Sequence, residues 1–563
     1  MTTRSMTPAD APVPTGAATS AGRATTLAAA AAGAIAGAAA IAVGEIIASL
    51  ISGTPSLVLA IGDLIIDLQP PGAKQFMADT FGTNDKLALN LVIVGVAIAI
   101  AAGLGIASRR QWRTGVVGFG IAGAVAAFAG IREPLSSQVL AVLNAVIAVA
   151  VSLVVLRALL LATGPAWGPR PAAPPLTTTS PAARRRVVLA GSQAATEAPL
   201  LGWSRWDRRR FLILAGSTAL GSLVLGVLGR YRLNNGGGVS PGAVAVVLPS
   251  APPSAVAPSI VPADSFDLPG ITPLIMPNDQ FYRIDTSLLV PRVDETTWSM
   301  KVSGMVDTEV TLTYAQLQAM PIFEQYVTIA CVSNQVGGDL VGNAKWTGVH
   351  LRDVLAMAGV QSGATQIVGH SVDDFTVGFP TAWAMDPTRD PMIALGMNGV
   401  PLPSEHGFPA RLIIPGLYGY VSATKWLAEI ELTTLEGFDA YWVQLGWAKE
   451  GPILTQSRID VPSNGASVAA GTVPVAGVAW APDRGISAVE ISVDGGPWLP
   501  AELSSALNKA TWVQWRVDWQ ATAGSHVVEV RATDGTGTVQ TAETSDPPPD
   551  GARGHDKIQV QVS

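Results

Sequence analysis

The sequence predicts three consecutive parts: an N-terminal transmembrane helix bundle, a soluble α+β domain and a C-terminal β-sandwich. The chain has 563 residues, of which 48% are apolar and 14% are charged, a composition typical of several domains with a membrane part. Residues 1–230 carry 18 Lys/Arg against 9 Asp/Glu, whereas the remainder carries 17 against 33. Because phosphate binding needs clustered Lys and Arg, the acidic remainder argues against nucleic acid as a partner.

The helix bundle is predicted from five apolar stretches that approach or reach the roughly 20 residues that span hydrocarbon. They are Thr26–Ile51, Leu87–Ala107, Thr114–Ile131, Val139–Leu161 and Phe211–Gly229. The shorter stretch Leu57–Leu68 carries Asp63 and Asp67, so we expect an interfacial or re-entrant segment, with a sixth span as the alternative. The expected order is a disordered N-terminus (1–24), about four spans (25–162), a cytoplasmic linker (163–207) and the last span (208–230).

The orientation follows from basic residues, which cluster at Arg109–Arg113 and from Arg184 through Arg210. The positive-inside rule places the amino terminus inside and everything after Arg230 outside. We therefore expect a multi-pass protein of the cell membrane with its soluble α+β domain, the candidate for any catalytic role, on the extracytoplasmic side. Residues 206–212 (WDRRRFL) resemble a twin-arginine export motif, and the alternative is ordinary positive flanking of the last span.

The first histidine of the chain is His350, so none of the predicted spans supplies the paired imidazoles that b-type haem normally needs. We expect the bundle to anchor the protein in lipid rather than to relay electrons through haem. Asp63 and Asp67 would be its functional candidates if it bound quinone or lipid.

A second linker, residues 231–262, precedes the α+β domain expected at residues 263–455. Short β-type runs such as Leu312–Tyr314 and Arg411–Ile414 alternate there with helical patterns such as Leu351–Ala358. The domain has no GxGxxG motif after a strand, no P-loop and no HExxH motif. Dinucleotide, nucleoside-triphosphate and zinc-protease functions therefore have no support.

Cys331 is the only cysteine of the chain and lies between a β-type run (Tyr326–Ile329) and a Gly-rich loop. A single thiol excludes an intramolecular disulfide, a Cys-x-x-Cys pair, a cysteine-ligated iron–sulfur cluster and c-type haem attachment. Three roles remain open. The first is a buried inert side chain, and the second is a nucleophile paired with His406 or His370. The third is one soft thiolate ligand to a metal carried mainly by a cofactor.

Four segments resemble the molybdopterin-binding domain of the sulfite oxidase family, in that family's order. They are Thr272–Arg283 (TPLIMPNDQFYR), Thr328–Gly348 (TIACVSNQVGGDLVGNAKWTG), Met397–Gly416 (MNGVPLPSEHGFPARLIIPG) and Tyr418–Leu427 (YGYVSATKWL). The resemblance implies a molybdenum–molybdopterin cofactor with Cys331 as the one protein ligand to the metal. It implies that the residues binding this cofactor are Asn278, Asn334, His406, Arg411, Ser422 and Lys425. These residue types suit a dithiolene cofactor, which needs one further sulfur, and its phosphate tail, which needs cations.

The resemblance also bears on the substrate. In the family an arginine near the first segment faces the metal, and alignment at Pro277-Asn278 puts the catalytic candidate Arg283 one place early and Ile284 where that arginine would fall. Gln335 and Val336 stand where the sulfite oxidases proper carry arginine, and residues 375–379 (FTVGF) lack the tyrosine expected beside the metal. A pocket with fewer cations should bind a small dianion such as sulfite less well.

The last part, residues 456–563, is β-rich. Its β-type runs are Val473–Trp480, Ala488–Val493, Trp512–Trp519 and His526–Ala532. Asp494-Gly495-Gly496 signals a hairpin turn before Trp498, and this spacing predicts a β-sandwich. It resembles the immunoglobulin-like dimerisation domain of the same family. That resemblance implies a homodimer, and the alternative is a sandwich that packs only on its own chain.

Taken together, these features predict a membrane-anchored molybdenum-cofactor oxidoreductase that carries out two-electron oxygen-atom transfer. Sulfite or a related small anion is the first substrate expected, and reduction of an S-oxide or N-oxide on the same cofactor is the alternative. With no haem or iron–sulfur ligand set in the sequence, electrons are expected to pass to a separate carrier. Two hypotheses of another class are a Cys-dependent hydrolase and a non-enzymatic surface binding protein.

Overall fold

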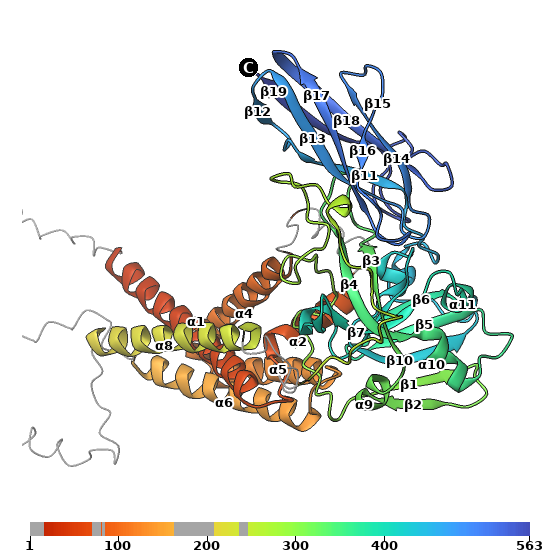
Figure 1. The fold of residues 1–563 in the computed structure, drawn as a ribbon. Coiled ribbons are helices and arrows are strands. Elements are labelled where there is room, and N and C mark those ends of the chain that lie inside the picture. The colour runs from red at the N-terminus through yellow and green to blue at the C-terminus, as the bar shows by residue number, and fades with distance from the viewer. Residues whose placement is uncertain (1–15, 70–79, 81–84, 163–207, 236–245) are drawn as a thin grey trace, which may run out of the picture. The chain divides into compact units, whose positions relative to one another are not determined.

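The computed structural model describes residues 16–69, 80, 85–162, 208–235 and 246–563 (Figure 1). The first 15 residues, the predicted linker 163–207 and, within it, the start of the twin-arginine-like string lie outside this described part. The chain divides into two compact units, Met1–Gly236 and Gly237–Ser563, and each is described by itself.

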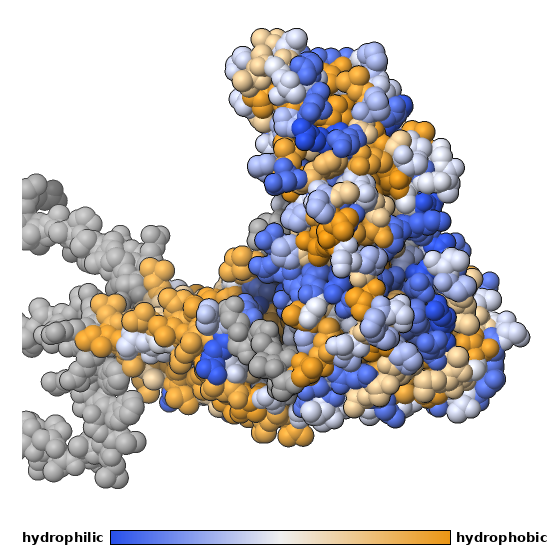
Figure 2. Space-filling model, in the orientation of Figure 1, coloured by the Kyte–Doolittle hydropathy of each residue, from blue (hydrophilic) through white to orange (hydrophobic). Residues whose placement is uncertain are grey.

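The first unit is helical. Its helices are α1 (Gly16–Leu50), α2 (Leu57–Leu68), α4 (Asp85–Arg110), α5 (Trp112–Ile131), α6 (Gln138–Ala162) and α8 (Arg208–Asn235). Within the described residues, five helices are long and apolar enough to cross a membrane, and they coincide with the five predicted stretches. Large apolar side chains on α4, α5, α6 and α8 are exposed, and Figure 2 shows an apolar surface over this unit.

Small residues allow the helices of this unit to pack closely. Gly33 on α1 and Gly105 on α4 leave no room for a Cβ, because each would meet the backbone of the other helix. Polar contacts also join helix ends: the Glu45 carboxylate accepts a hydrogen bond from Ser56, the N-cap of α2, and pairs with Arg230 of α8 at 3.4 Å.

The second unit contains the predicted α+β domain, built on two sheets. One sheet has the order β2-β1-β10-β5-β6, and its strands are β1 (Ser299–Gly304), β2 (Val310–Thr313), β5 (Gln366–Ser371), β6 (Thr376–Pro380) and β10 (Leu427–Thr433). The other has the order β3-β4-β7-β8 with β9 paired to β7, and its strands are β3 (Ile322–Ala330), β4 (Val341–His350), β7 (Met392–Met397), β8 (Val400–Pro401) and β9 (Arg411–Ile413). The short helices are α9 (Tyr314–Gln318), α10 (Leu351–Ala358), α11 (Thr381–Met385) and α12 (Gly419–Ser422).

Local sequence accounts for most of these elements. The predicted helix Leu351–Ala358 is present as α10, which buries Leu351, Val354 and Leu355 on one face and ends at Gly359 with φ +71°. The predicted β-type run Leu312–Tyr314 was wrong at its last residue. Thr313 caps α9 in a capping box with Gln316, so the chain turns helical at Tyr314.

The predicted linker 231–262 differs from the structure over its second half, because residues 246–262 pack on the α+β domain. Val246 and Leu248 contact its apolar core, and the Glu324 amide donates to the Ala255 carbonyl at 2.8 Å. The Tyr326 hydroxyl donates to the Pro258 carbonyl at 3.1 Å. Proline, alanine and serine make up most of this stretch, and composition alone does not show which of its valine, leucine and isoleucine side chains dock on the core.

The β-sandwich predicted at the C-terminus is present as two sheets. One is β11 (Gln456–Val461), β13 (Gly471–Trp480), β17 (Val513–Ala521) and β16 (Glu502–Leu503); the other is β12 (Ala466–Val468), β19 (Asp556–Val562), β18 (Gly524–Asp534), β14 (Ile486–Val493) and β15 (Leu499–Pro500). Their facing sides bury Val475, Ile491 and Trp515. The predicted hairpin joins β14 to β15, with positive φ at Asp494 and Gly495 as a type I′ turn requires.

Candidate active site

An open cavity lies in the α+β domain beside the end of β3. Its volume, including the mouth, is about 860 Å³. Aromatic side chains form much of its wall; they are Phe281, Tyr282, Phe375, Tyr420, Trp426, Trp442 and Trp447. The titratable lining residues are Tyr282, Arg283, Asp285, Cys331, Asp373, His406, Arg411, Tyr420 and Lys425. The cavity therefore collects residues from all four segments that resemble the family.

Cys331 lines this cavity directly after β3. The β3–β4 hairpin pairs through Ala330 and Val341, and the Cys331 amide then donates to the Leu340 carbonyl at 2.9 Å. Burial raises the pKa of the Cys331 thiol, and hydrogen bonds from the amide and hydroxyl of Ser333 oppose that rise. In the protein without a metal, the side chain is thus a protonated thiol rather than a free thiolate.

His406 and Arg411 lie on the same wall and are buried. His406 ends the 3₁₀ helix η4 (Ser404–His406), and its Nε2 donates to the Asn278 carbonyl at 2.8 Å. Burial, together with the nearby cations Arg411 and Lys425, lowers the pKa of His406 to about 4 even though that hydrogen bond opposes the shift, so the imidazole is neutral. Arg411 on β9 donates from Nη1 to the His406 carbonyl at 3.1 Å.

No carboxylate among the described residues pairs with the Arg411 guanidinium. It lies over the Trp346 ring at 5.1 Å, and burial lowers its pKa to about 10, which still leaves it charged at neutral pH. Its Nε is buried and makes no hydrogen bond to the described residues. A buried charged donor without a partner is costly, so this atom is suited to an anionic ligand.

Arg283 and Lys425 share one carboxylate. Arg283 Nε and Lys425 Nζ each lie 2.9 Å from Asp285 Oδ2, and the Asp285 side chain is only 2% exposed. Burial lowers the pKa of Lys425 to about 8, with Asp285 opposing the shift. Asp373 is a second carboxylate on the wall, and burial raises its pKa.

Three predicted cofactor-binding side chains do not line the cavity. Asn278 Oδ1 accepts from Asn398 at 2.7 Å, and Asn334 Oδ1 accepts from the Leu340 amide at 2.8 Å, which closes the loop after Cys331. The Ser422 hydroxyl donates to the Tyr418 carbonyl at 3.0 Å. These side chains hold the backbone around the cavity, and a direct contact with a cofactor stays a prediction for them.

Sequence reasoning missed several wall residues. The tyrosine sought at residues 375–379 is absent there, but Tyr282 and Tyr420 both line the cavity. Burial and the neighbouring Cys331 raise the pKa of Tyr282. Tyr282 directly precedes Arg283 in the first segment, so its position there could have identified it as a residue of the cavity wall. Trp442 and Trp447 lie outside all four segments, and nothing in the sequence singled them out.

The two histidines proposed as partners of a nucleophilic Cys331 are engaged elsewhere. His406 donates to the Asn278 carbonyl, and His370 Nε2 pairs with Glu431 Oε2 at 2.9 Å. The described residues contain no group of three His, Cys, Asp or Glu side chains that could hold a metal alone. The lining instead fits a metal that brings its own sulfur ligands, with Cys331 as the added thiolate and Arg411 and Lys425 for a phosphate tail.

Comparisons with known proteins agree with this chemistry. Residues 287–442 match the model of the oxidoreductase molybdopterin binding domain, and residues 456–530 match that of the bacterial Ig domain. The chain is 30% identical over 293 residues to mitochondrial sulfite oxidase of Mus musculus, which covers 44% of this chain and 53% of that protein. It is 28% identical over 309 residues to nitrate reductase (NADH) 1 of Oryza sativa subsp. japonica, covering 44% of this chain and 34% of that protein.

Among solved structures, the sulfane dehydrogenase SoxCD from Paracoccus pantotrophus matches with a TM-score of 0.46 and 22% identity, over 54% of this chain and 86% of that one. The chain spans about half the length of the mammalian sulfite oxidases it matches, at 53% for the mouse protein. The two family-model matches confirm the predicted molybdopterin-binding and immunoglobulin-like domains, and the match to sulfite oxidase confirms the predicted resemblance. The chain therefore carries a molybdopterin-binding oxidoreductase domain that is similar to the sulfite oxidase family.

Proposed function

We propose that this protein is a membrane-anchored molybdenum-cofactor oxidoreductase that carries out two-electron oxygen-atom transfer. One observation carries the proposal: the only thiol of the chain lines a cavity whose wall also holds Arg411 Nε, a buried guanidinium donor that makes no hydrogen bond to the described residues. When bound, the cofactor would supply the metal centre at which an oxygen atom and two electrons are exchanged. The protein would supply the ligand, the anion-binding cations and the walls that shape the substrate pocket.

Each residue has a distinct task in this proposal. Cys331 would hold the metal through its thiolate, because a dithiolene-bound metal needs one further soft ligand. Arg411 and Lys425 would bind the cofactor phosphate, and His406 would keep Arg411 in place through its carbonyl, the acceptor of the Arg411 hydrogen bond. Asn278, Asn334 and Ser422 would support the backbone that lines the site.

Sulfite or a related small anion is the first substrate that we propose. The relatives are named as sulfite oxidases and nitrate reductases, and both names refer to small oxyanions. Arg283 is 41% exposed at the side chain and lines the cavity, so it would attract such an anion. Tyr282 would act beside it as a hydrogen-bond donor, because its raised pKa keeps the phenol protonated.

A second candidate, reduction of an S-oxide or N-oxide, is favoured by the charge and composition of the same walls. Arg283 and Lys425 share the Asp285 carboxylate, so they present less positive charge to a dianion than their number indicates. The aromatic side chains of Tyr420, Trp442 and Trp447 offer apolar contact area that a bare oxyanion would not use.

The cellular setting belongs to the proposal as well. The five apolar helices support anchoring in a lipid membrane, and the distribution of Lys and Arg supports an extracytoplasmic catalytic domain. Electrons would pass to a separate carrier, with no haem or iron–sulfur cluster in this chain. Export of the folded domain by the twin-arginine route and homodimerisation through the β-sandwich stay predictions.

Metal and pterin analysis of the purified full-length protein tests the proposed function. We expect about one molybdenum and one pterin per chain in the wild type, since one thiolate site is present, and a loss of molybdenum in Cys331→Ser. Lys301→Gln, which removes an exposed cation on β1, should leave the molybdenum content unchanged. Undiminished molybdenum and activity in Cys331→Ser would contradict the ligand assignment. Turnover of sulfite, S-oxides and N-oxides with artificial electron carriers then separates the two substrate classes.

A further inference from the structure

β3, the strand that leads into Cys331, is covered by the β-sandwich along the second half of its outer edge. β3 is the edge strand of its sheet, with β4 on one side. On the other side the Thr328 amide donates to the Ala510 carbonyl at 2.8 Å, and the Trp512 amide donates to Thr328 Oγ1 at 2.8 Å. Asn508 Nδ2 donates to the Tyr326 carbonyl at 2.9 Å. The sandwich thereby satisfies backbone groups that an edge strand would otherwise expose.

The loop after Cys331 also contacts the sandwich. Arg458 on β11 donates from Nη1 to the Gly338 carbonyl at 2.8 Å. Gly337 has φ +74°, and a Cβ at this position would overlap the Asp556 carboxylate. The same carboxylate accepts a hydrogen bond from the Ile459 amide at 2.8 Å, and this bond holds the Asp556 side chain against the loop.

Arg458 is itself held on three sides. Its Nε lies 2.7 Å from Asp460 Oδ1, and its Nη2 donates to Thr272 Oγ1 at 2.7 Å. The side chain is only 11% exposed, so these charge-assisted bonds are weakly screened by solvent. One guanidinium thus connects the sandwich, the first segment of the cofactor domain and the loop that follows Cys331.

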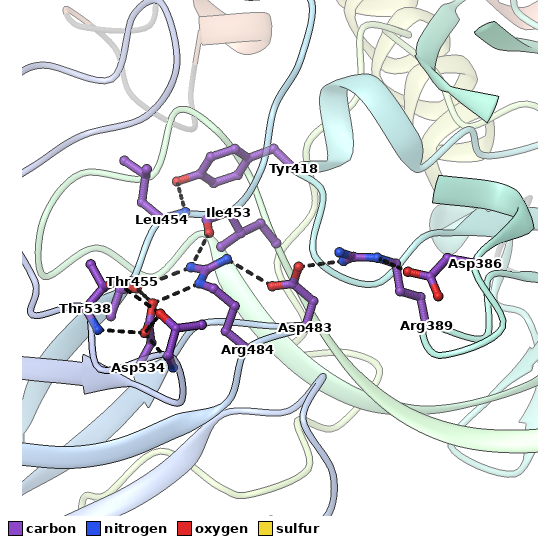
Figure 3. Close-up of polar contacts among 11 residues, drawn as sticks. Asp386, Arg389, Tyr418, Ile453, Leu454, Thr455, Asp483, Arg484, Asp534 and Thr538 are labelled. Atoms are coloured by element: carbon purple, nitrogen blue, oxygen red, sulfur yellow. Dashed lines mark hydrogen bonds and ion pairs between the residues drawn. The ribbon is translucent and has the colours of Figure 1, made fainter. Parts of the chain in front are cut away.

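A second connection reaches the segment before α12, and Figure 3 shows it. Arg484 donates from Nη2 to the Ile453 carbonyl at 2.9 Å and pairs with both Asp483 and Asp534. The next residue, Leu454, donates its amide to the Tyr418 hydroxyl at 3.4 Å. Tyr418 is the N-cap of α12, and Tyr420 within that helix lines the cavity.

We propose that the immunoglobulin-like domain positions the cofactor ligand, with Arg458 as the positioning residue that fixes the loop 331–340 and so the direction of Cys331 into the cavity. This role rests on the proposed function, because it matters only if Cys331 holds the metal. It differs from a role in dimerisation, since every contact that carries it lies within one chain. It also differs from simple packing, since the contacts gather on the strand and the loop on either side of Cys331.

Hydrogen exchange of the full-length, cofactor-free protein tests the contact. The loop amides of Cys331, Asn334 and Leu340 are hydrogen-bonded within the loop, so their exchange reports its opening. Arg458→Met should speed exchange of a peptide covering 331–340 by about tenfold, the ratio expected for one lost hydrogen bond to a charged group. Arg458→Lys should recover part of the protection, since it keeps the charge without the planar fork.

Arg531→Met is the matched control. Arg531 pairs with Glu490 on β14 and lies over Trp498 within the sandwich. Its loss should leave exchange of the 331–340 peptide at the wild-type rate. Equal acceleration in both variants would show a general loosening of the sandwich and would overturn the proposal.

The molybdenum-loaded protein gives the readout that a purely structural role would not move. The electron paramagnetic resonance spectrum of the one-electron-reduced metal responds to its thiolate ligand, so Arg458→Met should shift that spectrum and Arg531→Met should not. An unshifted spectrum in Arg458→Met overturns the positioning role even if the loop loosens. A wild-type protein without molybdenum would refute the proposed function, and the positioning role with it, while the exchange data would still show whether Arg458 restrains the loop.

Discussion

Lys425 and Asp285 form a buried ion pair on the wall of the cavity, with Nζ and Oδ2 separated by 2.9 Å. Asp285 is also the partner of Arg283, so one carboxylate limits the positive charge that two cations present. This pair decides how strongly the cavity attracts anions, and it sets the first prediction.

Asp285→Asn should increase the affinity of the cavity for small oxyanions, because it releases two cations from a shared carboxylate. We expect sulfate to bind cofactor-free protein about tenfold more tightly, measured by calorimetry at low ionic strength, where screening is weak. The same change should lower the melting temperature, since it leaves a buried ammonium without its partner.

Asp439→Asn is the control, because it removes the carboxylate of an ion pair with Lys449 in which the Asp439 side chain is 57% exposed. It should change neither quantity. Unchanged sulfate affinity in Asp285→Asn would mean that the shared carboxylate does not limit anion binding.

Arg411→Met should remove cofactor while leaving the fold intact. The methionine fills similar apolar space beside Trp346, but it cannot bind a phosphate. We expect the pterin and molybdenum content to fall about tenfold or more, because the loss of one charge-assisted hydrogen bond weakens binding by about that factor. Arg352→Met, which breaks a partly exposed pair with Asp390, should retain full cofactor. Wild-type loading of Arg411→Met would exclude Arg411 from the cofactor site.

The stability of the cofactor-free protein should fall as the medium is acidified, because of His406. Its pKa is lowered from 6.5 to about 4 in the folded state, so the unfolded state binds more protons between these values. The contribution of neutral His406 is complete above pH 6.5 and is lost toward pH 4, with a total of about 3 kcal/mol. Melting temperatures from pH 8 to 4 should fall less steeply in His406→Gln.

His526→Gln serves as the comparison for that titration. His526 is hydrogen-bonded to Asp494, which raises its pKa, so its linkage has the opposite sign and lies at higher pH. Parallel curves for wild type and His406→Gln would show that burial of this imidazole does not govern the acid sensitivity.

The sequence predicted the elements and residues that local pattern or scarce chemistry identifies. Cys331 is the only thiol, and Arg411 and Lys425 are the cations of two recognisable segments, so the structure brings together residues that could be named in advance. Residue pairs distant in the chain were not predictable. Lys425 is 140 residues from Asp285, and Arg458 is 120 residues from Gly338, so each contact exists only through the folded topology. The docking of residues 246–262 could not be predicted, because composition alone does not reveal which alanines and valines meet a core.

Trp447→Ala should distinguish the two substrate classes. Trp447 lines the cavity and packs against Tyr420 and Trp442, with ring centroids 5.8 and 6.0 Å apart. A substrate with an apolar group would lose contact area on this wall. Burial of about 60 Å² contributes roughly 1.5 kcal/mol at 25 cal/mol per Å², so KM for an aryl or alkyl S-oxide should rise by about tenfold. KM for sulfite should change little, because an oxyanion gains its binding energy from Arg283 rather than from the indole.

Trp498→Ala is the control, because it removes a tryptophan side chain from the sandwich, where that ring lies under Arg531. It should leave both KM values unchanged. A tenfold rise in KM for sulfite alone would show that the aromatic wall contributes to binding of the anion. The aromatic wall would then no longer favour S-oxides as substrates.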